Sequence, residues 1–333
     1  MPKPGVCVII PNWNGQKRLA RLLPLLREQS RPPDEIVIVD NGSEDASVCV
    51  AEAAGARVIR LPRNMGFARA VNEGIRANEY DWIAVVNNDV VPRADWLERL
   101  LTAAQPEEYW FAASKLLDAS DPKRLDGCYD EISRGGCAWH CGQGRKDGGI
   151  WNQPRRIRFT PLTASLFRAK LFDRVGLLDE GFESYLEDVD FGIRCALRGY
   201  SGVYAPDAVA AHEGSATLGK WHPDTVRRIS RNQLLLVAKH FPRNWVWRYG
   251  WPVLAGQTLW GLLAARHGCG FAYFWGKIQG LRVLWRRAAP APSSEAVADL
   301  LSGSEREIYR LQRTSGMDAY WKFYFALTRA ALR

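Results

Sequence analysis

Residues 6–14 read VCVIIPNWN, a β-branched run that ends abruptly in a polar, turn-forming cluster. The same pattern returns at 35–45 (EIVIVDNGSED), 57–66 (RVIRLPRNMG) and 82–89 (WIAVVNND). Leucines at helical spacing follow the first run, and a second segment of helical period follows the third. Strands that alternate with helices predict βαβ units and a parallel sheet, so we expect an α/β protein.

The composition is that of an ordinary folded protein. Of 333 residues, 47% are hydrophobic and 24% charged, which excludes fibrous and disordered classes. Lys and Arg outnumber Asp and Glu by 45 to 36, and the net charge of +9 suits nucleic acid, an anionic membrane or a nucleotide-bearing substrate. No nucleic-acid recognition motif occurs, so we do not expect that partner. Seven cysteines and no recognisable secretory signal predict reduced thiols and a cytoplasmic location.

Nucleotide chemistry is expected where the parallel strands end. The chain has no G-x-G-x-x-G after its first strand and no G-x-x-x-x-G-K-[ST], which disfavours dehydrogenases and P-loop kinases. Ligands of such sheets bind outside the carboxyl ends of the strands. Asp40 follows the second run and can hold a base or a ribose. Asp89 follows the fourth run and can ligate Mg²⁺ or Mn²⁺ on a diphosphate.

Five motifs, in order along the chain, resemble the family-2 glycosyltransferases, which have the GT-A fold. They are PNWN at 11–14, VDNGS at 39–43, NMGFARAVN at 64–72, NND at 87–89 and YLEDVDFGIR at 185–194. Within the family the chain looks most like the bacterial rhamnosyltransferase-like branch. The resemblance implies a mostly parallel central sheet flanked by helices, with a Rossmann-like nucleotide-binding half, and a C-terminal helical extension.

The resemblance also implies a donor site. In that family the Asp after the second strand holds the nucleobase, which here is Asp40. The other residues expected at the nucleotide-sugar are Pro11, Asn12, Asn14, Asn41, Asn64, Gly66, Asn72 and Asn88. A simple turn-capping role for Asp40 stays open as the alternative.

A divalent metal, Mg²⁺ or Mn²⁺, is implied at the last residue of the D-x-D-type motif, Asp89. His212, in the motif AHEGS at 211–215, matches the histidine that often completes this metal site. Asn87 stands where a strict motif would have Asp, which removes one carboxylate. The alternative for His212 is a loop histidine whose nitrogens are satisfied by the protein.

Three carboxylates lie within the four residues 187–190. The resemblance implies that the pair Glu187 and Asp188 supplies the catalytic base, with Asp188 taking the proton, and that Thr163, Asp190 and Arg194 serve the acceptor half. Arg194 lies one helical turn beyond Asp190 and is expected to orient its carboxylate. The alternative is that the helix dipole alone stabilises acidic residues at a helix start.

A glycine-rich stretch between residues 125 and 159 carries Cys128, Cys137, His140 and Cys141. The spacing is poor for zinc, because the adjacent His140 and Cys141 rarely ligate one ion well. We therefore favour a loop that lines the acceptor site over a structural zinc site.

Basic and aromatic residues dominate the later part of the chain. Residues 225–294 contain no Asp or Glu but eleven Lys or Arg, with six tryptophans: Trp245, Trp247, Trp251, Trp260, Trp275 and Trp285. We favour helices that lie in the interface of an anionic membrane. A helical subdomain packed on the core and a membrane-spanning helix are the alternatives. Further on, Ser304 and Glu307 form a capping box that predicts a helix start at Ser304.

These expectations combine into one function. We predict an inverting, metal-dependent glycosyltransferase that moves a sugar, with rhamnose as the candidate, from a UDP- or dTDP-sugar to a hydroxyl of a lipid-linked or cell-surface glycan. A polyprenyl-diphosphate-linked acceptor at the inner face of the cell membrane would give the basic, Trp-rich block a purpose. The alternative is a catalytically silent, membrane-associated scaffold with the same fold, and homo-oligomer formation stays open.

The expected domain organisation follows the motifs. Residues 1–240 would form the GT-A domain, with a nucleotide-sugar-binding half at 1–110 and an acceptor-binding, catalytic half at 111–240. Residues 241–333 would form the basic, Trp-rich helical region.

Overall fold

The computed structural model describes residues 3–214, 221–242, 244–284 and 294–328. Contacts divide the chain into two units, one of Met1–Tyr129 with Gly142–Gly214 and one of Asp130–Cys141 with Ser215–Arg333. In the second unit, helix α7 (Pro223–His240) packs against α9 (Gly270–Leu284). The predicted boundary at residue 240 therefore does not coincide with a boundary between these contact units.

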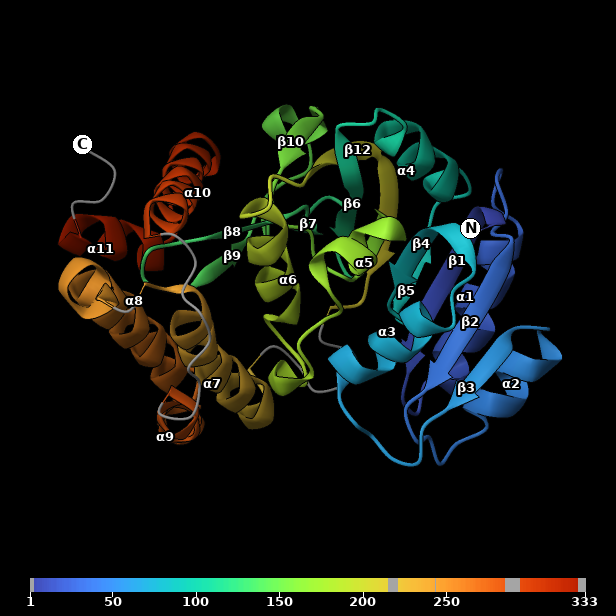
Figure 1. Cartoon of the computed structure of the whole chain (residues 1–333), viewed down its shortest axis with the longest axis horizontal. Helices are drawn as coiled ribbons and strands as arrows, with labels where there is room; N and C mark the ends of the chain where they lie inside the picture. Colours follow the sequence, from blue (N-terminus) through green and yellow to red (C-terminus); the bar gives the residue numbers. More distant parts are fainter. Residues whose placement is uncertain (1–2, 215–220, 243, 285–293, 329–333) are drawn as a thin grey trace. The chain divides into compact units, whose positions relative to one another are not determined.

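The described part of the first unit is built on one ten-stranded sheet. The main path runs β10-β12-β6-β11-β4-β1-β2-β3, with β5 paired to β12 and β7 paired to β6 (Figure 1). The strands are β1 (Lys3–Asn12), β2 (Glu35–Asp40), β3 (Arg57–Arg60), β4 (Tyr80–Val86), β5 (Val90–Pro92), β6 (Tyr109–Asp118), β7 (Leu125–Gly127), β10 (Arg155–Ile157), β11 (Ala164–Arg168) and β12 (Ser201–His212).

One half of this sheet is entirely parallel. Strands β3, β2, β1 and β4 pair in parallel, with Asn12 beside Asp40 where β1 and β2 end. In the other half β11 runs antiparallel to both β4 and β6, whereas β12 runs parallel to β6. The α/β fold with a mixed, mostly parallel central sheet is confirmed, and the four parallel strands form its Rossmann-like half.

Alternate strand residues reach two helical layers. Val6 and Val8 of β1 join the main hydrophobic core, which α1, α2 and α4 cover. Ile9 faces α3, because a Cβ on Gly74 would lie only 2.3 Å from Ile9 Cγ2. The helices of this unit are α1 (Gln16–Arg27), α2 (Ser47–Ala53), α3 (Phe67–Arg76), α4 (Trp96–Ala104), α5 (Lys170–Val175) and α6 (Glu187–Ala196), with 3₁₀ turns η1 (Gly149–Asn152) and η2 (Glu180–Phe182).

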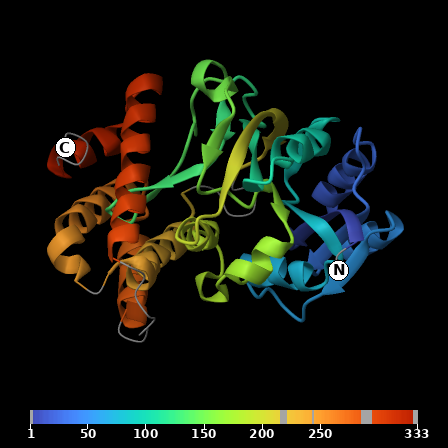
Figure 2. The ribbon, with the colours of Figure 1, turned by 45° about the horizontal axis from the view of Figure 1, so that its top comes forward.

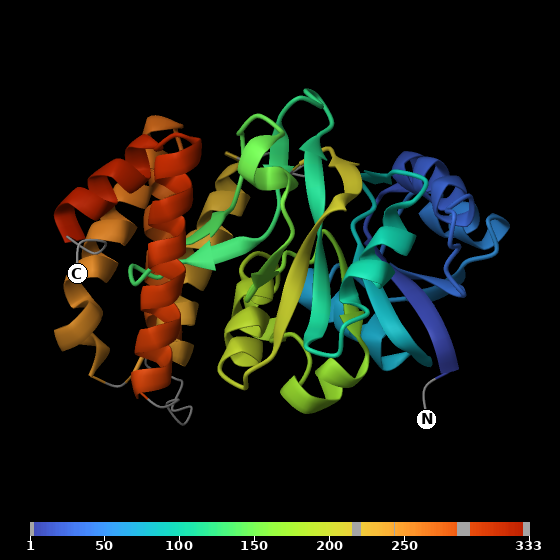
Figure 3. The same ribbon diagram turned by 90° about the horizontal axis from the view of Figure 1, so that it is seen from above.

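The second unit consists of one hairpin and the C-terminal helices. Strand β8 (Asp130–Ile132) pairs antiparallel with β9 (Ala138–His140), and this hairpin lies against α10 (Figures 2 and 3). Helix α8 packs against α9 and α11. The predicted C-terminal helical region is confirmed as α7 to α11, in which α8 is Trp245–Arg266, α10 is Ser294–Ser315 and α11 is Ala319–Thr328.

The helix start predicted at Ser304 is wrong. Helix α10 begins at Ser294, because buried apolar residues at helical spacing already start at Val297 and Leu301. Ser304 lies in the middle of the helix. Its hydroxyl accepts a hydrogen bond from the amide of Ile132 (2.7 Å) and donates one to the carboxylate of Glu131, so the hairpin uses the group that was expected to cap the helix.

The tryptophans of the basic block divide between interior and surface. Trp260 packs against Trp221, whereas Trp247 and Trp251 on α8 are 91% and 56% exposed. Trp285 lies outside the described residues. None of the helices described here is long and apolar enough to cross a membrane.

Candidate functional site

Three neighbouring strand ends carry a row of polar side chains, two of them buried and one half-buried. Asn12 ends β1, Asp40 ends β2, and Asn88 follows β4. Asn12 Nδ2 donates to Asp40 Oδ1 (3.3 Å), and Asn88 Nδ2 donates to Asn12 Oδ1 (2.8 Å). Asn12 and Asp40 are only 2% and 3% exposed. The parallel register thus brings three predicted residues, far apart in sequence, into one hydrogen-bonded row at the edge where such sheets bind ligands.

The carboxylate of Asp40 also organises the turn that follows it. Its Oδ2 accepts a hydrogen bond from the amide of Ser43 (3.0 Å). Within this turn Gly42 has a φ of +77°, and a Cβ there would lie 2.5 Å from Cα of Arg63. The turn-capping contact considered as the alternative role of Asp40 is therefore present, and it fixes the carboxylate at the edge of the sheet.

Pro11 and Asn14 shape the loop on the other side of Asn12. Pro11 is paired with Val39 inside the parallel ladder. Asn14 adopts a left-handed φ of 49°, and its Oδ1 accepts a hydrogen bond from the amide of Glu44 (2.8 Å). Both residues therefore support the loops around Asp40.

Asn41 joins the end of β2 to the loop before α3. Its Oδ1 accepts a hydrogen bond from the amide of Met65 (2.8 Å). Its Nδ2 donates to Asn64 Oδ1 (3.2 Å) and to the carbonyl of Gly66 (3.1 Å). The structure thus brings Asn41, Asn64 and Gly66 together beside the strand ends, where the two asparagine side chains hold the loop.

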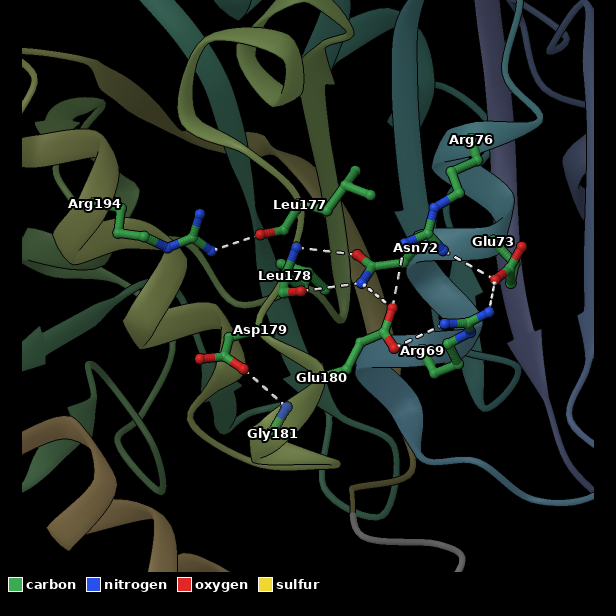
Figure 4. A network of polar contacts seen from close by, with 10 residues as sticks. All are labelled: Arg69, Asn72, Glu73, Arg76, Leu177, Leu178, Asp179, Glu180, Gly181 and Arg194. Carbon is green, nitrogen blue, oxygen red and sulfur yellow. Dashed lines mark hydrogen bonds and ion pairs between the residues drawn. The ribbon is translucent and has the colours of Figure 1, made fainter. Parts of the chain in front are cut away.

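Asn72 lies elsewhere. It is 1% exposed on α3, where its Oδ1 accepts the amide of Leu178 (3.0 Å) and its Nδ2 donates to the carbonyl of Leu178 (3.0 Å) and to Glu180 Oε1 (2.9 Å) (Figure 4). These bonds use both N–H groups of the side-chain amide, so Asn72 holds the segment before α6, and its contact with a nucleotide-sugar stays a prediction.

His212, the last residue of β12, lies between two aspartates. Its Nε2 is 3.2 Å from Asp89 Oδ1, and its Nδ1 is 2.7 Å from Asp126 Oδ2. The pairing of β12 with β5 produces this arrangement, because it sets His212 opposite Val90. Burial by itself would lower the pKa of His212, but hydrogen bonds and charges from Asp126 and Asp89 outweigh burial and raise the pKa to about 10.

Asp126 was not identified from the sequence. It lies in the three-residue strand β7, which is held in place by pairing with β6, and no local pattern marks it. In metal sites a carboxylate commonly bonds one nitrogen of a histidine and thereby aims the other nitrogen at the ion. Asp126 has this relation to Nδ1 of His212, and Nε2 faces Asp89.

The residues around Asp89 fit a cation that is held only partly by protein. Oδ1 of Asp89 and Oδ1 of Asn87 are buried and form no aligned hydrogen bond. Within the described ranges, no three or more His, Cys, Asp or Glu side chains form a complete metal site. Mg²⁺ is usually bound by one or two carboxylates, with phosphates and water as its other ligands. Asp89 and His212, with the amide oxygen of Asn87, suit such a partial site.

The acidic segment begins helix α6. Glu187 is 5% exposed, and Asp188 is half-buried with its Oδ1 accepting the amide of Val189 (2.8 Å). Asp190 is fully buried, and its Oδ2 accepts Nε of Arg194 (3.0 Å), which confirms that Arg194 orients this carboxylate. Both side chains are used inside the protein. The structure therefore shows that Asp190 and Arg194 hold the segment, and their direct contact with an acceptor stays a prediction.

Thr163 lies beside the metal-binding candidates. Its carbonyl oxygen accepts a hydrogen bond from the amide of Asn87 (2.8 Å), at the point where β11 begins to pair with β4. A residue of the expected acceptor-binding half thus contacts the loop that carries Asp89.

The cysteine-rich stretch does not gather into one cluster. Cys128 belongs to the first unit, where its thiol donates to the Tyr204 hydroxyl (3.2 Å) and burial raises its pKa to about 12. His140 belongs to the hairpin of the second unit, where its Nδ1 lies 2.8 Å from Asp130 Oδ1. The structural-zinc alternative therefore lacks a shared ligand set in the described part of the chain. Lys115 Nζ, 2.9 Å from Asp147 Oδ1, ties the glycine-rich loop to the sheet.

Comparisons with known proteins agree with the motifs. Residues 7–176 match the family model described as Glycosyl transferase family 2. A pre-mycofactocin glycosyltransferase of Mycobacterium tuberculosis is 26% identical over 219 residues, which cover 65% of this chain but only 44% of that protein. An N-acetylglucosaminyl-diphospho-decaprenol L-rhamnosyltransferase of the same organism is 27% identical over 237 residues, covering 64% of this chain and 77% of that protein.

Among solved structures, a mannosyltransferase of Pyrobaculum calidifontis in complex with GDP-Man and Mn²⁺ has the same fold. The match covers 100% of this chain and 88% of that chain, with a TM-score of 0.54 and 16% sequence identity.

Proposed function

The chain belongs to glycosyl transferase family 2, and from this premise we propose that it transfers a sugar, with inversion, from a UDP- or dTDP-sugar to a glycan hydroxyl. One observation carries the proposal. The hydrogen-bonded row of Asn12, Asp40 and Asn88 lies at the same sheet edge as the pair of Asp89 and His212. A nucleoside diphosphate needs both features, a polar site for its base and ribose and a cation site for its phosphates.

The donor is assigned to the edge of the parallel strands. Asp40 holds the nucleobase, and the loops fixed by Asn12, Asn14, Asn41 and Asn64 surround it. The similar rhamnosyltransferase of M. tuberculosis supports rhamnose as the sugar and a polyprenyl-diphosphate-linked acceptor. The solved mannosyltransferase, which is in complex with GDP-Man and Mn²⁺, supports a nucleotide-sugar with a divalent metal.

Asp89 and His212 would hold Mg²⁺ or Mn²⁺, and the buried amide oxygen of Asn87, two residues before Asp89, is a further candidate ligand. When bound, such a cation supplies positive charge that stabilises the leaving diphosphate. Asp126 keeps the imidazole of His212 in one orientation through Nδ1, so that Nε2 stays directed at Asp89.

Asp188 is the base of the transfer, supported by the buried Glu187 next to it. Its carboxylate accepts the proton of the acceptor hydroxyl. The oxygen of that hydroxyl forms a bond to the anomeric carbon while the bond from this carbon to the diphosphate oxygen breaks. A single displacement inverts the anomeric configuration. Half-burial suits this role, because the acceptor can reach Asp188 while water around it is reduced.

A thermal-shift panel tests the donor site. UDP, dTDP, GDP and ADP are each added with and without Mn²⁺, and a ligand at a hundred times its dissociation constant should add about 2.7 kcal/mol of stability. We expect UDP or dTDP to raise the melting temperature only with metal, and Asp89→Asn to abolish the increase. Asp95→Asn, the same change at a surface ion pair with Arg99, is the matched control and should behave like the wild type. A panel without any shift would contradict the proposed donor site.

The catalytically silent scaffold remains the second candidate, and Asp188→Asn separates it from the enzyme. The assay measures release of the nucleoside diphosphate from the donor that the panel identifies. If the chain is an enzyme, the variant keeps the thermal shift and loses release. If the wild type and Asp188→Asn release the diphosphate equally slowly, the scaffold is favoured.

We further propose that α8 lies on an anionic membrane surface. Trp247, Trp251 and Leu254 are 91%, 56% and 59% exposed on this helix, and Arg248 lies exposed beside them. Helices α8 and α9 contain no acidic residue, so nothing on them repels a negatively charged leaflet. Exposed Trp and Leu with flanking Arg are the composition of helices that bind at the interface.

Vesicle co-sedimentation tests the membrane surface. The chain should pellet with vesicles of phosphatidylcholine and phosphatidylglycerol but not with phosphatidylcholine alone. The double variant Trp247→Ser with Trp251→Ser should lose this binding, whereas Trp13→Ser, a change at an exposed tryptophan of the first unit, should keep it. If the double variant instead changes only the mass measured by light scattering, the surface joins two copies of the chain.

A further inference from the structure

The first turn of α3 is capped by a distant part of the chain. Its N-cap residue is Gly66, which has no side chain to cap with. The amide of Ala68 donates to the carbonyl of Glu183 (2.9 Å), and the amide of Phe67 donates to Oγ of Ser184 (3.2 Å). Two of the four free amides that begin this helix are therefore satisfied by the turn that directly precedes the acidic segment.

That turn is held in an unusual backbone conformation. Glu183, Tyr185 and Leu186 have φ angles of 61°, 71° and 67°, in the left-handed region that side chains other than glycine rarely adopt. Such residues persist only where their surroundings force the conformation, and they gather at functional sites. The next residue is Glu187, followed by Asp188, so the conformation of the turn sets where the proposed base begins its helix.

Gly66 permits the close approach that this arrangement needs. It has a φ of +90°, and a Cβ at this position would lie 2.9 Å from the carbonyl oxygen of Glu183. The carbonyl of Gly66 in turn accepts a hydrogen bond from Asn41 Nδ2 (3.1 Å), next to Asp40. A single loop residue thus contacts both the turn before the proposed base and the loop beside the proposed nucleobase site.

A second set of contacts joins α3 to the residues before the turn. Asn72 bonds both backbone groups of Leu178 and the carboxylate of Glu180, and Arg69 Nη1 lies 2.9 Å from Glu180 Oε2 (Figure 4). Arg76 Nη2 reaches the same carboxylate at 3.3 Å. The segment that leads into the turn is therefore fixed along one face of α3.

We propose that α3 positions the catalytic segment, with Ser184, Gly66 and Asn72 as positioning residues for Asp188. The inference rests on the proposed function, since it assumes that Asp188 is the base. Helix α3 holds the strained turn at its N-terminus and holds residues 178–180 along its side. Because the loop before α3 is bonded to Asn41, the donor edge and the base are set by one rigid element.

The first test uses hydrogen exchange and needs no substrate. Ser184→Ala removes the acceptor for the amide of Phe67, so amides 183–190 should exchange with deuterium faster than in the wild type. Ser184→Thr keeps the hydroxyl and should restore the slow exchange. Equal exchange in the wild type and in Ser184→Ala would overturn the inference, whatever the activity.

The second test separates positioning from folding. Release of nucleoside diphosphate is measured with UDP-glucose, dTDP-rhamnose and GDP-mannose as probes, and melting temperatures are recorded in parallel. Ser184→Ala should lower kcat about 10- to 100-fold, with KM for the donor within about twofold, because small displacements of a catalytic group cost this much. Ser184→Thr should recover most of kcat.

Relief of the backbone strain provides the matched variant. Glycine populates positive and negative φ about equally, so Glu183→Gly removes the unfavourable φ of 61° and also leaves the turn freer to change its conformation. We expect a lower kcat at an unchanged or higher melting temperature, which a merely stabilising contact would not produce. If kcat and melting temperature fall together in Ser184→Ala without rescue by Thr, the positioning role is refuted. If the wild type releases no diphosphate and binds no nucleotide, the proposed function fails instead.

Discussion

Replacing Asp190 with Asn tests whether this residue supports the segment or contacts an acceptor. Asp190 has no exposed surface, and its partner Arg194 is 15% exposed. Arg194 also donates to the carbonyls of Val175 (3.0 Å) and Leu177 (2.8 Å), so its guanidinium joins α6 to the chain after α5. The variant keeps the volume of the side chain but leaves the guanidinium without its counter-charge.

The expected loss of stability follows from this burial. Removing one partner of a buried ion pair typically costs about 3–5 kcal/mol, because the other charge stays buried without compensation. Arg194 is partly exposed and keeps its carbonyl contacts, so the loss of stability in Asp190→Asn should lie near the lower end of this range, at about 3 kcal/mol. Arg194→Lys keeps the positive charge but loses the planar guanidinium with its several N–H donors, and it should lower the stability by about 1–2 kcal/mol.

Urea unfolding followed by circular dichroism measures these differences. Asp173→Asn, the same change at an exposed position on α5, serves as control and should stay within about 0.5 kcal/mol of the wild type. A loss below about 1 kcal/mol for Asp190→Asn, together with a raised KM for the acceptor, would refute the structural role and restore direct acceptor contact.

Three further predictions concern the frame around the site. In metal-free buffer, the pKa of about 10 means that the charged form of His212 stabilises the fold below pH 6.5. This contribution, at most about 5 kcal/mol, is lost as the pH rises toward 10. His212→Gln should remove this pH dependence from melting curves recorded across the pH range, and identical curves for the variant and the wild type would refute the prediction. Gly42→Ala should destabilise the protein by about 1–3 kcal/mol in thermal unfolding, because φ is +77° and the new Cβ meets Arg63 at 2.5 Å; an unchanged melting temperature would contradict this. Trp96→Phe should lower the free energy of unfolding measured in urea by about 1–2 kcal/mol, because the buried hydrogen bond from Trp96 Nε1 to Ser114 Oγ (2.7 Å) is lost. An unchanged free energy of unfolding would mean that this bond makes no net contribution to stability.

The parallel half of the fold could be predicted because its signals are local. Each β-branched run became a strand, although β1 begins at Lys3, three residues before the run that starts at Val6. The row of Asn12, Asp40 and Asn88 was also within reach, because strand ends of a parallel sheet meet at one edge whatever the rest of the chain does.

Other features depended on pairings that no local pattern contains. Asp126 reaches His212 only because β7 pairs with β6 and β12 pairs with β5. The resemblance marked Asn72 and Asp190 as functional, but a motif does not distinguish a side chain that touches a substrate from one that holds the backbone. The structural role of Asn72 became visible only from its burial and from its bonds to residues about a hundred positions away.

The position of β11 has a consequence for how the protein is made. This strand lies between β4 and β6, so it pairs with the last strand of the parallel half. Until β11 leaves the ribosome, β4 is an unpaired edge strand that contains the apolar residues Ile83 and Val85. Such an edge can pair with strands of other chains and lead to aggregation. A fragment of residues 1–110 should therefore aggregate when it is expressed alone. The parallel half of the sheet is completed by a strand from later in the chain, so we expect that neither part can be exchanged alone between proteins.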